Sequence, residues 1–239
     1  ILDINKLWPK ISNFSFTSNT KKIIKFGKVN FEDQVVTLNP DLIFSFKELS
    51  IGVSSTLNIK PGVTIELPSY AFIDIRGKLN SNGTVDKPVN IGTAKGWSYL
   101  NFNNAKGVLR HTNIYGGGAV SQNSHTAIEL RNSDFDCRNC RIWDQRAPGN
   151  AIRAFNSSIA LVNSEIGMDT KYPDPRGWYA NYTTGIRIDG GNLFLDNVNF
   201  VNLNYAVFKT SQATGIQPTI ITQNMTPSNY VNVFRPYAW

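Results

Sequence analysis

Apolar and polar residues alternate along three eight-residue segments, and these segments align with one another without gaps. Apolar or small residues recur at the first, third, sixth and eighth positions of each segment. Because successive side chains of a strand point to opposite faces, this alternation predicts strands that are buried on one side. The segments are Phe135–Ile142, Ile159–Ile166 and Leu193–Phe200, and a weaker copy runs from Gly107 to Ile114.

A second set of short strands lies five residues upstream of the first. Successive members of both sets are separated by the same irregular intervals of 28, 24 and 34 residues. Short strands that recur in this way predict a parallel β-solenoid, in which stacked turns build one continuous core. Neighbouring turns would lie ~4.8 Å apart. The members of the second set are Leu100–Phe102, Ile128–Leu130, Ile152–Ala154 and Ile186–Ile188.

Asparagine occupies the fifth position of all three segments, as Asn139, Asn163 and Asn197, and His111 holds this position in the weaker copy. Stacked turns would let these amides hydrogen-bond to one another and to the turn backbone, so we expect an internal asparagine ladder. The alternative is that they are surface residues of a chain in which 28 of 239 residues are Asn.

The stretch before these repeats is a series of short strands and turns. It reads Leu57–Ile65 around Pro61-Gly62, then Phe72–Leu79, Asn82-Gly83-Thr84, Lys87–Ile91 and Trp97–Phe102. This series resembles the opening turns of right-handed parallel β-helix proteins of the pectate-lyase-like superfamily. The resemblance covers about residues 51 to 210. It implies an all-β, right-handed, single-stranded parallel β-helix. It does not imply one activity, because that superfamily includes lyases, hydrolases, phage tailspikes and non-enzymatic surface proteins.

The two ends of the chain differ from the repeats. A solenoid end needs a cover, because exposed edge strands recruit other chains. We therefore expect residues 1–50 to form an N-terminal cap, with strands at Ile23–Phe26 and Val35–Leu38, and residues 51–225 to form the β-helix. The C-terminal tail, residues 226–239, contains several aromatic residues, and it either closes the other end or docks on a partner.

Composition and charge narrow the class of protein. Charged residues make up 17% of the chain, and the abundance of Asn with 18 Gly argues against a helical bundle. The net charge is +7, but the basic residues are dispersed and no groove-reading motif accompanies them, so we expect no nucleic-acid binding. The chain has no run of eighteen apolar residues, so the sequence predicts no membrane-spanning helix. The start at Ile1 and five Asn-X-Ser/Thr sites indicate a mature, secreted or cell-surface product.

The cysteines and histidines offer little for a metal or redox centre. Cys137 and Cys140 form the one Cys-X-X-Cys pair, and only His111 and His125 are available to complete a zinc site. We expect two core cysteines or a local disulfide, and no metal or cofactor.

Candidate chemistry is sparse along the repeats. Asp134, Asp136, Asp189 and Asp196 lie near repeat strands but do not stack, so they do not form the carboxyl pair of a glycosidase. The outward positions of the second set hold Glu129, Arg153 and Arg187. This column is either a substrate-facing basic strip with one acid or alternating charge on a solvated sheet.

The loops are the best candidates for binding. Tyr115 and Trp143 follow the same repeat position on successive turns, and an insertion at 167–184 leaves from that position on the next. We expect these segments to gather on one flank and bind a ligand through aromatic side chains; packing over the solenoid is the alternative. The candidate residues on the insertion are Tyr172, Asp174, Arg176, Trp178 and Tyr179.

We therefore predict a non-enzymatic extracellular or cell-surface module with a structural or adhesive role, whose partner is a glycan or another surface protein. One alternative is a polysaccharide lyase or glycoside hydrolase, which rests on fold analogy. Another is a phage receptor-binding tailspike, which would be a trimer.

Overall fold

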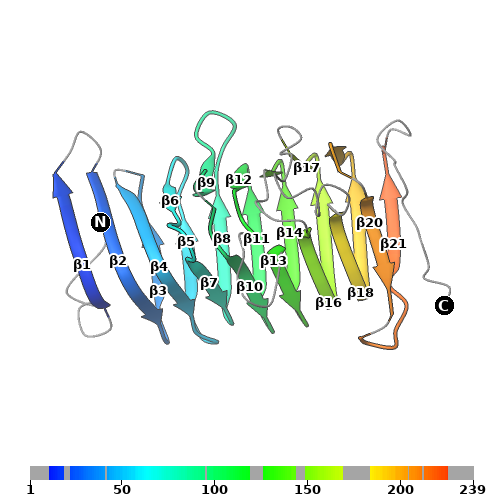
Figure 1. The fold of residues 1–239 in the computed structure, drawn as a ribbon, viewed down its shortest axis with the longest axis horizontal. Helices are drawn as coiled ribbons and strands as arrows, with labels where there is room; N and C mark the ends of the chain where they lie inside the picture. Colours follow the sequence, from blue (N-terminus) through cyan, green and yellow to red (C-terminus); the bar gives the residue numbers. More distant parts are fainter. Residues whose placement is uncertain are drawn as a thin grey trace, which may run out of the picture.

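The computed structural model describes residues 11–18, 22–40, 42–94, 96–118, 126–143, 149–168, 184–203, 205–211 and 213–225, and for residues 11–18 and Lys22 only the backbone. Within these ranges the chain forms 21 strands and no helix. The strands wind into a parallel β-solenoid of about seven turns (Figure 1). The expected all-β solenoid fold is confirmed.

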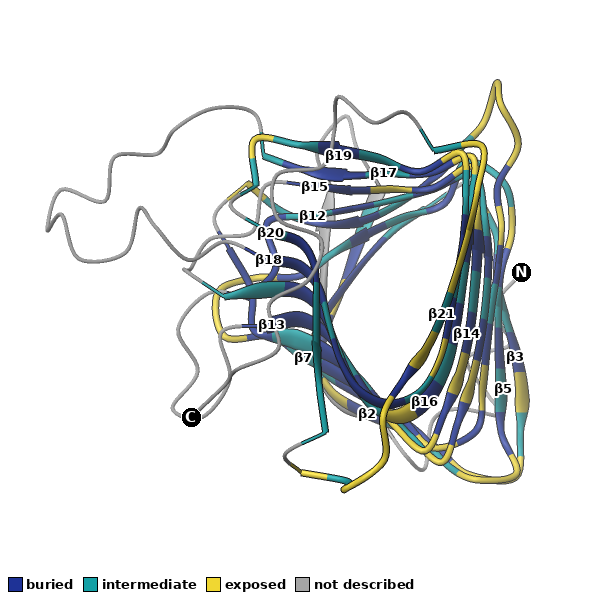
Figure 2. Cartoon of the chain, turned by 90° about the vertical axis from the view of Figure 1, so that its right-hand side faces the viewer, coloured by how far each residue is buried: buried dark blue, intermediate teal, exposed yellow. Residues whose placement is uncertain are grey.

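Three faces enclose the core, and buried residues line the inside of each face (Figure 2). Face 1 consists of β7 (Phe72–Ile75), β10 (Tyr99–Asn103), β13 (Thr126–Arg131), the first halves of β16 (Asn150–Val162) and β18 (Thr184–Asp196), and β20 (Tyr205–Thr210). Face 2 consists of β3 (Val35–Leu38), β5 (Thr56–Ile59), β8 (Lys78–Asn82), β11 (Lys106–Arg110), β14 (Asp134–Arg138), the second halves of β16 and β18, and β21 (Thr219–Gln223). Face 3 consists of β6 (Thr64–Glu66), β9 (Val89–Gly92), β12 (Thr112–Tyr115), β15 (Arg141–Trp143), β17 (Glu165–Gly167) and β19 (Asn199–Val201).

The register of the repeats is as predicted. Phe135 pairs with Ile159, and Ile159 with Leu193, and all three side chains are buried. The second set is also in register, from Leu100 through Ile128. Each turn therefore places its apolar residues directly over those of the turn before, which gives one core along the whole solenoid.

The predicted asparagine ladder lies outside the core, not within it. Asn139, Asn163 and Asn197 all have left-handed backbone conformations, with φ of 54°, 47° and 49°, and all three are exposed. The Nδ2 of Asn197 donates to Oδ1 of Asn163 at 2.9 Å, so stacking of the amides is confirmed for this pair. Asn139 instead contacts Nε2 of His111 at 3.5 Å. A left-handed corner interrupts the two-residue alternation, and Asn is the non-glycine residue that best tolerates it.

The residue after each corner asparagine is the one that points inward. Ser164 follows Asn163, and its buried hydroxyl accepts from the Cys140 amide at 3.1 Å and donates to the Val162 carbonyl at 2.8 Å. Ser133 does the same between the faces 1 and 2, where it follows the left-handed Asn132. These hydroxyls satisfy backbone groups that would otherwise be buried without a partner.

Cys140 occupies the corner position that Ser164 holds on the next turn. It forms a disulfide with Cys137, and both residues are buried. Of the two readings of this Cys-X-X-Cys pair, the local disulfide is correct.

The solenoid stacking begins upstream of the boundary expected at residue 51. Strand β2 (Lys22–Phe31) already pairs in parallel with β4 (Ile43–Ile51), and β3 pairs in parallel with β5. Strand β1 (Ile11–Ser18) runs antiparallel to β2. The reversal places an antiparallel strand against the first parallel turn.

Candidate functional site

One outward column on face 1 combines acids, an amide and arginines. Parallel pairing aligns Asp74 with Asn101, Asn101 with Glu129, Glu129 with Arg153, Arg153 with Arg187, and Arg187 with Phe208. We call these six residues the face-1 column. The expected alignment of Glu129, Arg153 and Arg187 is thus present, and it extends over three further turns.

Unpartnered polar atoms gather in this column. In the part of the chain that the structure describes, three buried side-chain polar atoms have no hydrogen-bond partner. They are Oδ1 of Asn101, Nε of Arg153 and Nε of Arg187. Buried polar groups in folded proteins are normally paired, so three exceptions in one column mark it as a binding candidate.

The two arginines lie side by side with like charge. Burial lowers the pKa of Arg153, and the neighbouring Arg187 lowers it further, while Glu129 opposes this shift. Glu129 accepts from Nε of Arg131 at 2.7 Å. Adjacent like charges on neighbouring strands are destabilising, and Glu129 and Asp189 offset this repulsion only in part.

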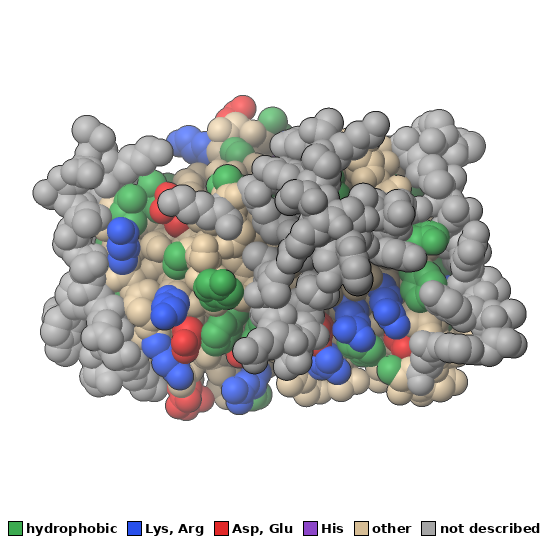
Figure 3. Space-filling model, in the orientation of Figure 1, with side chains coloured by type: hydrophobic (Ala, Val, Ile, Leu, Met, Phe, Trp, Pro, Cys, Tyr) green, Lys and Arg blue, Asp and Glu red, His purple; other side chains and the backbone are tan. Residues whose placement is uncertain are grey.

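Aromatic rings border the column. The guanidinium carbon of Arg153 lies 4.6 Å from the centre of the Phe155 ring, and that of Arg187 lies 5.5 Å from the Phe208 ring. At the other end, Tyr99 stacks on Phe72 with ring centres 5.6 Å apart. Burial, with Asp74 and Glu129, raises the pKa of the Tyr99 hydroxyl. Figure 3 shows one side of the molecule, where the described basic, acidic and hydrophobic side chains are intermingled.

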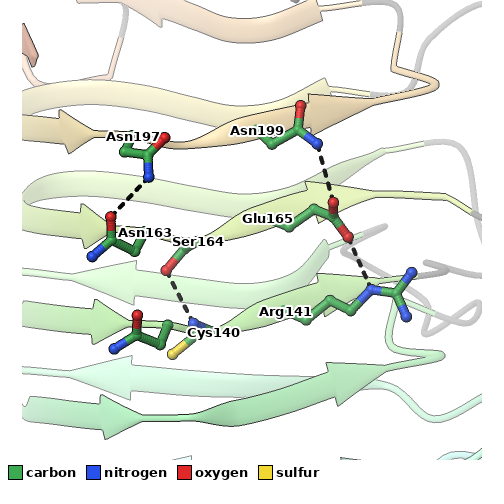
Figure 4. Close-up of a pocket in the computed structure, with 8 residues that line it drawn as sticks. Cys140, Arg141, Asn163, Ser164, Glu165, Asn197 and Asn199 are labelled. Carbon is green, nitrogen blue, oxygen red and sulfur yellow. Dashed lines mark hydrogen bonds and ion pairs between the residues drawn. The ribbon is translucent and has the colours of Figure 1, made fainter. Parts of the chain in front are cut away.

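A shallow groove of about 420 Å³ runs along the corner between faces 2 and 3 (Figure 4). Its lining is polar and largely self-bonded: Glu165 accepts from Nε of Arg141 at 3.0 Å and from Nδ2 of Asn199 at 3.1 Å. The exposed corner residues Asn139, Asn163 and Asn197 border it. Since these groups are already paired with one another, the groove has fewer unpaired polar groups than the face-1 column.

Tyr115 and Trp143 are brought together as predicted. They are paired in register on β12 and β15, and Trp143 pairs in turn with Gly167, where the long insertion starts. Trp143 is only 7% exposed, and the Arg141 guanidinium lies 3.9 Å from its ring centre. The ring is therefore packed, which limits its use as a ligand platform. The remaining predicted ligand residues, Tyr172, Asp174, Arg176, Trp178 and Tyr179, lie outside the described residues.

Three of the four aspartates considered for catalysis are held by hydrogen bonds. Asp136 accepts from Nη2 of Arg110 at 2.8 Å and from Nε of Arg138 at 3.1 Å. Asp189 is buried and accepts from the backbone amides of Ala213 and Thr214. Asp196 accepts from Asn224. Asp134 is exposed and stacks on Ser158.

Sequence reasoning missed several of these groups. Asn101 belongs to the second set of strands, but its amide resembles every other outward Asn, so only its place 28 residues before Glu129 connects it to the column. Phe155 and Phe208 carried no signal of their own. Among the described residues, no cluster of His, Cys, Asp and Glu could hold a metal ion.

Comparison with protein families, with curated proteins and with solved structures gives no significant match. No helix in the described ranges is both long and apolar enough to cross a membrane.

Proposed function

We propose that this chain is a non-enzymatic solenoid module that acts by attachment, with a glycan as its partner. The observation that carries the proposal is the face-1 column, where all three unpartnered buried polar atoms of the described residues lie. A rigid sheet that carries partly exposed arginines, acids and aromatic rings in one outward row is suited to recognising a ligand that follows the solenoid axis.

The carboxylates support binding over hydrolysis. A glycosidase needs two carboxyl groups placed across one bond and free to exchange protons. Here Asp136 joins two arginines, Glu165 joins Arg141 to Asn199, and Asp189 anchors the segment at 213–214. Acids engaged in this way tie adjacent turns together.

The disulfide supports an extracellular or cell-surface location for the module. Disulfides persist mainly in oxidising compartments. Cys137 and Cys140 form one across a solenoid corner, in a position where other turns use a serine or a valine. The resemblance to pectate-lyase-like β-helix proteins is compatible with this location and remains part of the proposal.

A glycan array and a reducing-sugar assay on the same polysaccharides test the function. We expect retention on a subset of glycans and no release of reducing ends. The double variant Arg153→Gln/Arg187→Gln should lose retention, while Arg76→Gln, at the exposed position that follows β7, should keep it. Catalytic release of sugar by the wild-type chain, or equal retention of both variants, would contradict the proposal.

A further inference from the structure

We infer that the face-1 column takes an acidic saccharide, with its anionic group between Arg153 and Arg187 and its hydroxyl groups toward Asn101 and Glu129. This inference rests on the proposed glycan-binding function and adds the chemical class and the orientation of the ligand.

The anionic end follows from the two arginines. They occupy the same position on adjacent turns, so their backbones are ~4.8 Å apart, and both Nε atoms are buried without a partner. The acids nearest to Arg153 are already engaged: Glu129 bonds Arg131, and Asp189 bonds the backbone at 213–214. Both arginine side chains are partly exposed, so a carboxylate or sulfate beside their guanidinium groups would supply acceptors and offset the repulsion between the two charges.

The saccharide character follows from the rest of the column. The Nδ2 of Asn101 donates to Asp74 at 3.0 Å, and both side chains are partly exposed, so this end of the column offers an amide and a carboxylate to a hydroxyl group. Asp74 and Glu129 at this end would repel a second anionic group, so a uniformly charged polyanion fits poorly. Asn101 and Arg187 are three turns apart, or ~14 Å along the axis. The ligand must therefore be extended, neutral and rich in hydroxyls at one end, and anionic at the other.

The rings of Phe72 and Tyr99 add an apolar element at the neutral end. Tyr99 lies on the same side of β10 as Asn101, two residues away, and stacks on Phe72. Saccharides present C–H surfaces as well as hydroxyl groups, and aromatic rings pack against such surfaces. An acidic peptide would place charge at both ends, against Asp74 and Glu129.

Thermal melting with defined small molecules tests the ligand class. The probes are sodium glucuronate, sodium sulfate, glucose and a short poly-glutamate peptide. At tenfold excess over its Kd, glucuronate should raise the wild-type Tm by about 3–6 °C. Sulfate should give a smaller saturable rise, glucose little, and poly-glutamate no more than sulfate.

Three variants locate the two ends of the ligand. Arg187→Gln should abolish the saturable responses to both anions. Asn101 lies two turns from Arg153, beyond the reach of a single sugar, so Asn101→Ala should preserve the responses to glucuronate and sulfate and weaken only the retention of longer acidic glycans on the array. Arg76→Gln makes the same charge change at the exposed position that follows β7 and should leave both responses intact. Only the saturable part of each curve is compared between variants, because sulfate also gives any protein a rise that does not saturate.

The outcomes separate this inference from the proposed function. Unchanged glucuronate and sulfate responses in Arg187→Gln would overturn the anion site, and a larger response to poly-glutamate than to glucuronate would replace the saccharide with an acidic peptide. Retention of neutral glycans only, on the array, would refute the acidic class while keeping the module a glycan binder. A saturable Arg187-dependent response without any glycan retention would keep the anion site and refute the attachment function.

Discussion

The outward columns of face 1 and face 3 are built on the same three turns but place charge in opposite ways. On face 3 the order is Arg141, Glu165 and Asn199, and each side chain bonds the next. On face 1 the corresponding order is Glu129, Arg153 and Arg187, and the two arginines meet without a bond between them. The charge of a side chain acts strongly on its neighbours in a column, because equivalent positions on adjacent turns are only ~4.8 Å apart. Opposite charges on adjacent turns attract and hold the turns together. Like charges on adjacent turns repel, and a ligand of opposite charge can offset that repulsion.

The largest effect is expected from removing the buried support beneath the face-3 column. Ser164→Val deletes the hydroxyl that accepts from the Cys140 amide, at a position where the next turn already carries Val198. Leaving that amide buried and unpaired should lower the free energy of unfolding by about 1–3 kcal/mol in denaturant titrations. Asn163→Gly keeps the left-handed corner and removes only an exposed amide; it should stay within about 0.5 kcal/mol. Equal losses for the two variants would show that the corner depends on the outer residue.

The second test makes face 3 resemble face 1. Glu165→Arg places a second guanidinium group next to that of Arg141. It also removes the carboxylate that accepts a hydrogen bond from Asn199. Because the side chains of Arg141 and Glu165 are 49% and 33% exposed, the loss should be about 1 kcal/mol and should shrink with added salt. Glu165→Gln, which can still accept from Asn199, should lose less. A loss that salt does not reduce would show that packing, and not charge, stabilises this column.

The third test makes face 1 resemble face 3. Arg187→Gln places a neutral amide over Arg153, as Asn199 lies over Glu165. Without added anion, relief of the repulsion should raise the free energy of unfolding by about 0.5 kcal/mol. A clear decrease in stability would mean that the packing of the Arg187 stem near Phe208 outweighs the like-charge cost.

The smallest effect concerns acid stability and the ties of face 2. Burial tends to raise the pKa of Asp136, but hydrogen bonds from Arg110 and Arg138 outweigh it and lower this pKa below 3.8. Asp136 therefore contributes stability that is present above that value and is lost as the pH falls through its folded-state pKa. Asp136→Asn should flatten the decline in Tm as the pH falls below about 4. A decline as steep as that of the wild type would show that Asp136 is not a stabilising tie.

The repeat register was predictable because like residues stack. Two sets of strands share the same irregular spacing, so only one register of the turns aligns both sets. The pairing of Phe135 with Ile159 follows from that register. The position of the asparagines relative to the core was not predictable by counting alternate residues. A left-handed residue at Asn163 turns the chain and exchanges inside for outside, so Ser164 takes the inner place.

The candidate site was predictable only in part. The column of Glu129, Arg153 and Arg187 is visible in the sequence, but whether each guanidinium finds a partner depends on distances across turns. Trp143 was expected to be a ligand platform, and its ring is instead packed beneath Arg141. The binding role of Tyr172 and Trp178 stays a prediction, because both lie outside the described residues.

The left-handed corners also allow one whole turn to be duplicated without changing the turns beside it. Asn132 and Asn156 are 24 residues apart in equivalent corners, with φ of 47° and 45°. A duplication of residues 132–155 would join one such corner to another, so no strand would change its inward and outward faces. The rod would lengthen by ~4.8 Å for each copy. Each copy would add one more outward arginine at the position of Arg153. The number of turns would thus set both the length of the molecule and the number of charges that a ligand meets.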